Sequence, residues 1–101
     1  LRRVDWTVNV EYGSSVEETK ELLMSLLKSD IRILNVAKDA PADPFVALGE
    51  LSESSVKFYM RGWVHTADYW DAYFDIIARV KPAFDAHGIE MTYPHINVHT
   101  V

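Results

Sequence analysis

Arg3-Val-Asp-Trp-Thr-Val-Asn-Val-Glu-Tyr12 opens the chain with a strict alternation of polar and apolar side chains. Successive side chains of a β-strand point to opposite faces of a sheet, so a two-residue period predicts a strand with one buried face. Gly13 and Ser14 end the pattern. The side chains expected on the buried face are Val4, Trp6, Val8, Val10 and Tyr12.

The segment after this strand predicts a helix. Ser15 and Glu18 form a capping box, in which the serine hydroxyl caps the Glu18 amide and the carboxylate returns to the Ser15 amide. Leucines recur at helical spacing until the helix is expected to stop near Ser29 and Asp30, and a short extended piece, 31–36, follows. The expected inner face comprises Val16, Leu22, Leu23, Leu26 and Leu27.

Two further strands are predicted at 45–51 and 55–65, and the polar turn 52–54 between them favours a hairpin. On the third strand Val56, Phe58, Met60 and Val64 share one face, whereas Lys57, Tyr59, Arg61 and Trp63 share the other. Exposed aromatic patches often mark contacts, so a neighbouring copy or domain is one explanation for Tyr59 and Trp63. The other is that both simply lie along the sheet near loops.

A second helix is predicted to begin at Thr66, whose side chain can cap it. Its end is predicted just before Gly88, because glycine commonly follows the last residue of a helix. Pro82 lies inside this helix, and we expect a kink or local unwinding there because proline lacks an amide donor. A short fourth strand, 89–93, follows, and 96–101 continues extended after Pro94. The apolar stripe of the helix comprises Tyr69, Trp70, Tyr73, Ile76, Ile77, Val80 and Phe84.

The order strand, helix, strand, strand, helix, strand predicts an α+β fold. We expect a ferredoxin-like βαββαβ sandwich, with two helices on one face of an antiparallel sheet and a C-terminal extended strand. The 101 residues suit one domain, and 49% of them are apolar. Leu1 and Val101 both lie within extended patterns, so we expect the chain to have been excised from a longer protein.

Composition excludes several classes of function. The net charge is −5 and no basic stripe is present, so nucleic acid is not an expected partner. No apolar run approaches the roughly 18 residues of a membrane span. The lack of cysteine favours the cytosol.

No pattern in the sequence indicates catalysis, a metal or a cofactor. The four histidines are His65, His87, His95 and His99. The last two would lie about 13 Å apart along a strand, too far for one metal ion. Nucleophile elbows and phosphate-binding loops are absent from the sequence, so we expect no enzyme. The acidic stripe of the second helix, Asp68, Asp71 and Asp75, is interpreted as the wet face of an amphipathic helix.

Several ordered motifs resemble one known family. They are Leu51-Ser-Glu-Ser-Ser-Val56, Arg61-Gly-Trp63, Ala67-Asp-Tyr-Trp70, Ile77-Ala-Arg-Val-Lys81, Phe84-Asp-Ala-His-Gly-Ile89, Tyr93-Pro-His95 and Val98-His99. Together they resemble the C-terminal cytoplasmic domain of the small-conductance mechanosensitive channel (MscS) family, across nearly the whole chain. The sequence departs from the family pattern at Ala78, Pro82, Thr92 and His95. If His95 packs at an interface, assembly would depend on pH.

The resemblance implies a homo-oligomer, usually a heptamer, on the cytoplasmic side of a prokaryotic inner membrane. Pore helices and a small β domain would precede Leu1. These C-terminal domains surround a cage with side portals, and their last strands form a small barrel. It implies a cage domain at 1–93 and the start of an oligomerising strand at 94–101. The expected interface residues are Tyr59, Trp63, His95, Ile96 and Val98.

Two functions remain open from the sequence. The first is a cage domain that holds subunits together and filters solutes, with the acidic stripe favouring cations if it faces a solute path. The alternative is a stand-alone small-molecule-sensing regulatory domain of the ferredoxin-like type, for which Gly13 is a faint signal. A clear hit in a thermal-shift screen with amino acids would favour the sensor.

Overall fold

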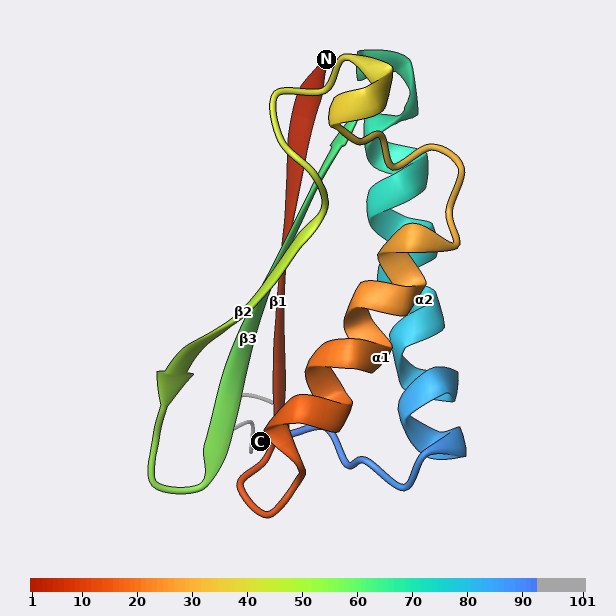
Figure 1. The fold of residues 1–101 in the computed structure, drawn as a ribbon. Helices are drawn as coiled ribbons and strands as arrows, with labels where there is room; N and C mark the ends of the chain where they lie inside the picture. The colour runs from red at the N-terminus through yellow and green to blue at the C-terminus, as the bar shows by residue number, and fades with distance from the viewer. Residues whose placement is uncertain (93–101) are drawn as a thin grey trace, which may run out of the picture.

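The computed structural model describes residues 1–92, in which two helices cover one face of a three-stranded antiparallel sheet (Figure 1). The strand order is β1-β3-β2. This arrangement confirms the predicted α+β fold with both helices on one face. The elements are β1 Arg2–Glu11, α1 Val16–Lys28, the 3₁₀ helix η1 Val36–Lys38, β2 Phe45–Leu51, β3 Ser55–Val64, the 3₁₀ helix η2 Thr66–Asp68 and α2 Tyr69–Ala86.

The central strand β3 pairs with β1 along its whole length, from Arg2 opposite Val64 to Glu11 opposite Ser55. Its pairing with β2 is interrupted by a register shift between Leu48 and Glu50. Gly49 lies in this irregularity, and a Cβ atom there would come within 2.1 Å of the Tyr59 ring. The missing side chain of the glycine therefore gives the Tyr59 ring its place on the sheet.

The core lies between the sheet and the helices. The predicted inward faces of β1 and β3 are confirmed, because Val4, Val8, Phe58 and Met60 are all 1% exposed or less. The prediction that Tyr12 is buried is wrong. Its side chain is 55% exposed, because β1 ends at Glu11 and the chain turns. Burying a large apolar side chain contributes about 1.5–3 kcal/mol relative to its exposure.

One of the two hydrogen bonds of the predicted capping box is present at the start of α1: the Ser15 hydroxyl accepts from the Glu18 amide at 3.2 Å. Leu23, Leu26 and Leu27 are buried as expected. Val16 was expected inside but is 38% exposed. Thr19 is the buried residue of that turn, and its hydroxyl donates to the Ser15 carbonyl at 2.7 Å.

The start of α2 differs from the prediction. Thr66 does not cap the helix, because 66–68 form the 3₁₀ helix η2 and α2 begins at Tyr69. Trp70 was placed on the buried stripe and is 58% exposed, while Ala72 is fully buried. The helix continues through Pro82 to Ala86, so the predicted local unwinding is wrong.

Packing against the core explains why α2 continues through Pro82, and a glycine explains where the helix ends. Val80 and Phe84 flank Pro82 and are completely buried, so packing on both sides holds the helix on the sheet. Gly88 has a φ of +68°, which confirms the predicted glycine just beyond the helix end.

Within the described residues 89–92 of the predicted fourth strand, the backbone forms one β-bridge, between Met91 and Val10. The Glu11 amide donates to the Glu90 carbonyl at 2.9 Å, and the Thr92 amide donates to Asn9 at the same distance. Residues 90–92 therefore lie along the β1 edge that β3 leaves free, which is where a ferredoxin-like fold has its fourth strand.

The predicted extended piece 31–36 is likewise reduced to one bridge, between Leu34 and Trp63. Residues 93–101, with the expected oligomerising strand at 94–101 and the histidines His95 and His99, lie outside the described part of the chain. Within residues 1–92, neither helix combines the length and the apolar character needed to cross a bilayer.

Candidate functional site

The sheet face opposite the helices carries Tyr59 and Trp63, as the alternation on β3 predicted, because these residues alternate with the buried residues of that strand. Both side chains are half-buried. At one end of this face a cavity of about 400 Å³ opens beside Trp63. It is lined by Arg3, Pro41, Ala42, Asp43, Pro44, Phe45, Arg61 and Trp63, and we call it the sheet-face cavity.

The cavity contains a cation that lacks a carboxylate partner. Asp5 lies directly opposite Arg61 in the strand register, but Asp5 accepts two hydrogen bonds from Arg3, at 2.9 and 3.1 Å. Within residues 1–92 no carboxylate lies within ion-pair distance of Arg61, whose guanidinium carbon is instead 5.3 Å from the centre of the Phe45 ring. A half-buried cation among aromatic walls can attract an anionic group.

A second unusual surface lies on α2, where four of the six residues 69–74 are aromatic. Trp70 and Phe74 stack with their ring centres 5.8 Å apart, and each is 58% exposed. Tyr69 and Tyr73 contact the Trp70 ring edge-on. We call these four residues the aromatic ladder. Sequence reasoning missed it by assigning Trp70 to the core, although the density of aromatic residues was a visible signal.

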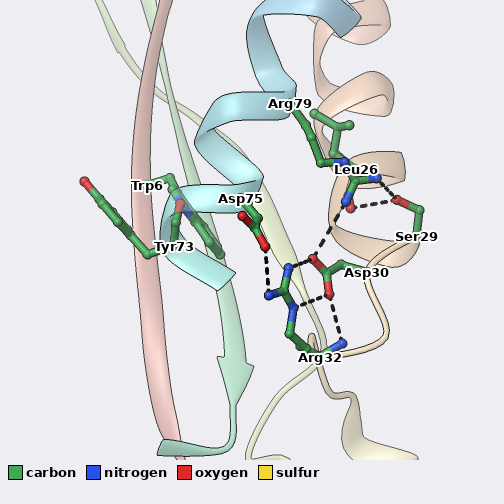
Figure 2. A network of polar contacts seen from close by, with 8 residues as sticks. All are labelled: Trp6, Leu26, Ser29, Asp30, Arg32, Tyr73, Asp75 and Arg79. Atoms are coloured by element: carbon green, nitrogen blue, oxygen red, sulfur yellow. Dashed lines mark hydrogen bonds and ion pairs between the residues drawn. The ribbon is translucent and has the colours of Figure 1, made fainter. Parts of the chain in front are cut away.

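One member of the aromatic ladder is anchored in the core. The indole nitrogen of Trp6 on β1 donates to the Tyr73 carbonyl at 3.0 Å, and the two rings stack at 6.4 Å (Figure 2). This contact fixes the first turns of α2 on the sheet, so that Trp70 and Phe74 are presented from a rigid support.

The contacts divide the predicted acidic stripe, of which Asp68 lies in η2 while Asp71 and Asp75 lie in α2. Asp75 forms an ion pair with Arg32, with 3.0 Å between the carboxylate oxygen and the guanidinium nitrogen. Asp68 and Asp71 have no ion-pair partner in the described range 1–92, and Asp71 is exposed next to Trp70. The three aspartates therefore do not act as one uniform surface.

Arg32 belongs to a polar network that joins the end of α1 to the middle of α2 (Figure 2). Its centre is Asp30, which is 6% exposed and accepts hydrogen bonds from the amide, Nε and Nη2 of Arg32 at 2.8–3.0 Å. Arg79 of α2 donates to the Ser29 hydroxyl at 3.0 Å and lies 3.7 Å from the Asp30 carboxylate.

The electrostatics of this network identify it as a structural brace. The hydrogen bond from the Arg32 side chain holds the pKa of Asp30 below its ordinary value of 3.8, against the opposing effect of burial. The same hydrogen bond raises the pKa of Arg32. Both groups therefore stay charged at neutral pH, so neither is suited to proton transfer.

In the range 1–92, no three histidine, cysteine or acidic residues come together in a way that could hold a metal ion. His65 is exposed at the end of β3, and the His87 ring nitrogen lies 3.1 Å from the Ala83 carbonyl. The two histidines in this range therefore lie at helix and strand ends and not in the sheet-face cavity.

Comparison with known proteins gives a consistent set of similarities. Residues 4–91 match the family model described as mechanosensitive ion channel MscS, C-terminal. A small-conductance mechanosensitive channel of Edwardsiella ictaluri is 36% identical over 98 residues, which are 97% of this chain and 32% of that protein. The chain thus spans about a third of the length of this relative.

Two solved structures have a fold similar to that of this chain. The crystal structure of Helicobacter pylori MscS in the closed state superposes with a TM-score of 0.77 at 26% identity, over 99% of this chain and 38% of that one. Arabidopsis thaliana MSL1 gives a TM-score of 0.74 over 92% of this chain and 34% of that one. Its identity is 8%, so this second likeness concerns the fold alone.

Proposed function

Because this chain belongs to the MscS family of mechanosensitive ion channels, as a C-terminal domain of that family, we propose that it holds channel subunits together by self-association. In this proposal its copies form the wall of a cage on the cytoplasmic side of the inner membrane, with seven subunits in the complete channel. The family is one of channels and not of enzymes. The alternative of a stand-alone sensing domain is not favoured by these similarities.

The observation that carries the proposal is the sheet face that the helices leave uncovered. It presents two large aromatic side chains, Tyr59 and Trp63, beside a cavity whose Arg61 forms no ion pair within residues 1–92. Aromatic and arginine side chains are enriched at the energetic centres of protein interfaces. A second contact is proposed for 94–101, where His95, Ile96 and Val98 would pair with the same strand of another copy, since an unpaired strand edge needs a partner.

The proposal is tested by replacing both sheet-face aromatics with serine. We expect sedimentation velocity of the unaltered 101-residue chain to show a mass that rises with concentration. The Tyr59→Ser/Trp63→Ser variant should need at least about tenfold more protein to reach the same mass, because tenfold corresponds to about 1.4 kcal/mol and truncating one interface hot spot costs about 2 kcal/mol or more.

The matched control is Tyr12→Ser, which removes an aromatic side chain that is 55% exposed but lies outside the sheet face. This variant should associate like the unaltered chain. Gly49→Val tests the same surface in a second way, because its side chain would displace the Tyr59 ring without removing it. This variant should also weaken self-association. A sheet-face double variant that is folded by circular dichroism and still associates normally would refute the assembly surface.

Solute filtering is the second part of the proposal. Asp68 and Asp71 carry the negative charge that would favour cations at a portal, whereas Asp75 is neutralised by Arg32. An unpaired acidic group near an opening raises the local concentration of cations, and this effect weakens with increasing salt.

A further inference from the structure

The aromatic ladder and the sheet-face cavity lie back to back at the same end of the domain. Neighbouring residues of β1 reach both surfaces: the Arg2 guanidinium lies 3.8 Å from the centre of the Tyr69 ring, whereas Arg3 lines the cavity. In Figure 1 the start of α2 and the loop that precedes β2 are both at the end that holds the N-terminus. The sheet separates the two surfaces, so a single copy cannot bring them together.

The two surfaces are chemically complementary. The ladder offers two stacked, solvent-exposed rings, Trp70 and Phe74. Beside them lies the carboxylate of Asp71, which forms no ion pair in the described part of the chain. The cavity offers proline and aromatic walls around the guanidinium of Arg61, which forms no ion pair within residues 1–92. The carboxylate of Asp43 in the lining accepts a hydrogen bond from the Val36 amide at 2.9 Å. Burying exposed rings and pairing two partly desolvated opposite charges are both favourable in one contact.

We propose that the aromatic ladder of one copy docks into the sheet-face cavity of the next copy, with Asp71 placed against Arg61. The inference rests on the proposed self-association and names the partner surface that the sheet face takes. Because the two surfaces differ, the contact is head-to-tail, and repeated contacts of this kind form a ring or a filament.

This arrangement moves Asp71 from a solute path to a subunit contact. Asp68 then remains the only member of the acidic stripe without a partner within the described residues or the proposed contact. The docking also gives a reason for the exposure of Trp70, which the helical periodicity alone had placed in the core.

Cross-linking between two different single-cysteine chains tests the arrangement. The chain contains no cysteine, so each introduced thiol is unique. Ala42→Cys places a thiol at the cavity, and Ala67→Cys places one a helical turn before Trp70. Oxidation of an equimolar mixture should give the mixed dimer at least about fivefold above either homodimer. A mixture of Ala42→Cys with Lys20→Cys, an exposed position on α1, is the matched control.

Charge exchange then tests the proposed ion pair. Asp71→Arg and Arg61→Asp should each lower the mixed-dimer yield by about tenfold, and the chain that carries both exchanges should regain most of it. Glu21→Arg on the exposed side of α1 controls for net charge and should leave the yield unchanged. Circular dichroism and thermal melting verify that each variant is folded.

The outcomes separate this inference from the proposed function. Mixed-dimer yields equal to the Lys20 control, or homodimers in excess, would overturn the docking even if sedimentation shows that the chain associates. A chain that remains monomeric at every concentration would contradict the self-association itself, and the docking with it.

Discussion

Replacement of Phe58 by alanine is expected to lower the free energy of unfolding by about 3–5 kcal/mol, the usual cost of removing a buried phenylalanine. Phe58 is completely buried and lies in the middle of β3, the strand that pairs with both neighbours. The lost side chain leaves a cavity between the sheet and the helices, because a close-packed core relaxes only in part. Urea unfolding followed by circular dichroism measures the change.

The matched control is Phe45→Ala on the neighbouring strand β2. Phe45 is 43% exposed, so its removal should cost no more than about 1 kcal/mol. Equal losses for the two phenylalanines would show that the core does not lie on the helix side of the sheet.

Replacement of Asp30 by alanine is expected to destabilise the fold by about 2–4 kcal/mol, because the loss leaves two arginines without their buried partner. Asp30 accepts three hydrogen bonds from Arg32, and the nearby Arg79 belongs to the other helix. The figure lies at the lower side of the range for buried pairs because the Arg32 side chain is still 25% exposed. Urea unfolding at pH 7 measures it.

The stability that Asp30 contributes should depend on pH, which a comparison of the unaltered chain with Asp30→Ala can measure. Because folding lowers the pKa of Asp30, the unfolded chain binds its proton more readily, and the stabilisation is fully present above the ordinary value of 3.8. It is lost as the pH falls below that value and through the folded pKa. The difference in stability between the unaltered chain and Asp30→Ala should therefore shrink between pH 6 and pH 3.

Asp85→Ala is the control for the loss of an exposed carboxylate. Asp85 is paired with Lys81 on the surface of α2, and such pairs contribute at most about 1 kcal/mol. An Asp30 variant that loses no more stability than the Asp85 variant would contradict the brace between the helices.

The strands and the helical layer could be predicted from local patterns. The alternation on β1 and β3 identified the buried face, because a strand half-covered by helices needs a two-residue period. The errors lie at element ends. Tyr12 and Val16 continue apolar patterns beyond the covered part of the sheet, and nothing in the local sequence marks where the covering layer ends.

The contacts between distant segments could not be predicted. Asp30 and Arg79 are far apart in the sequence, and only the packing of α1 on α2 brings them together. The sheet-face cavity likewise depends on how 41–44 folds beside Trp63. Trp70 was misplaced because helical periodicity counts any aromatic residue near the stripe as core, whereas small Ala72 is the residue buried against the sheet.

The proposed assembly function depends on surface side chains and not on the core. Trp63 and Tyr59 were identified by their place on the outer sheet face, and Gly49 explains how the Tyr59 ring is accommodated there. The aromatic ladder adds a second surface on the opposite side of the domain. The proposed docking of these two surfaces suits a wall made of repeated copies better than it suits an isolated module.

The most direct test is a chimera in which this chain replaces the corresponding third of the Edwardsiella ictaluri channel, to which it is 36% identical. The chimera would be expressed in bacteria that lack their own mechanosensitive channels, and survival of a sudden osmotic downshock would be measured. An assembly domain predicts survival close to that given by the intact relative, and loss of survival when the chimera carries Tyr59→Ser and Trp63→Ser. Full rescue by the chimera with both sheet-face aromatics removed would contradict the assembly role.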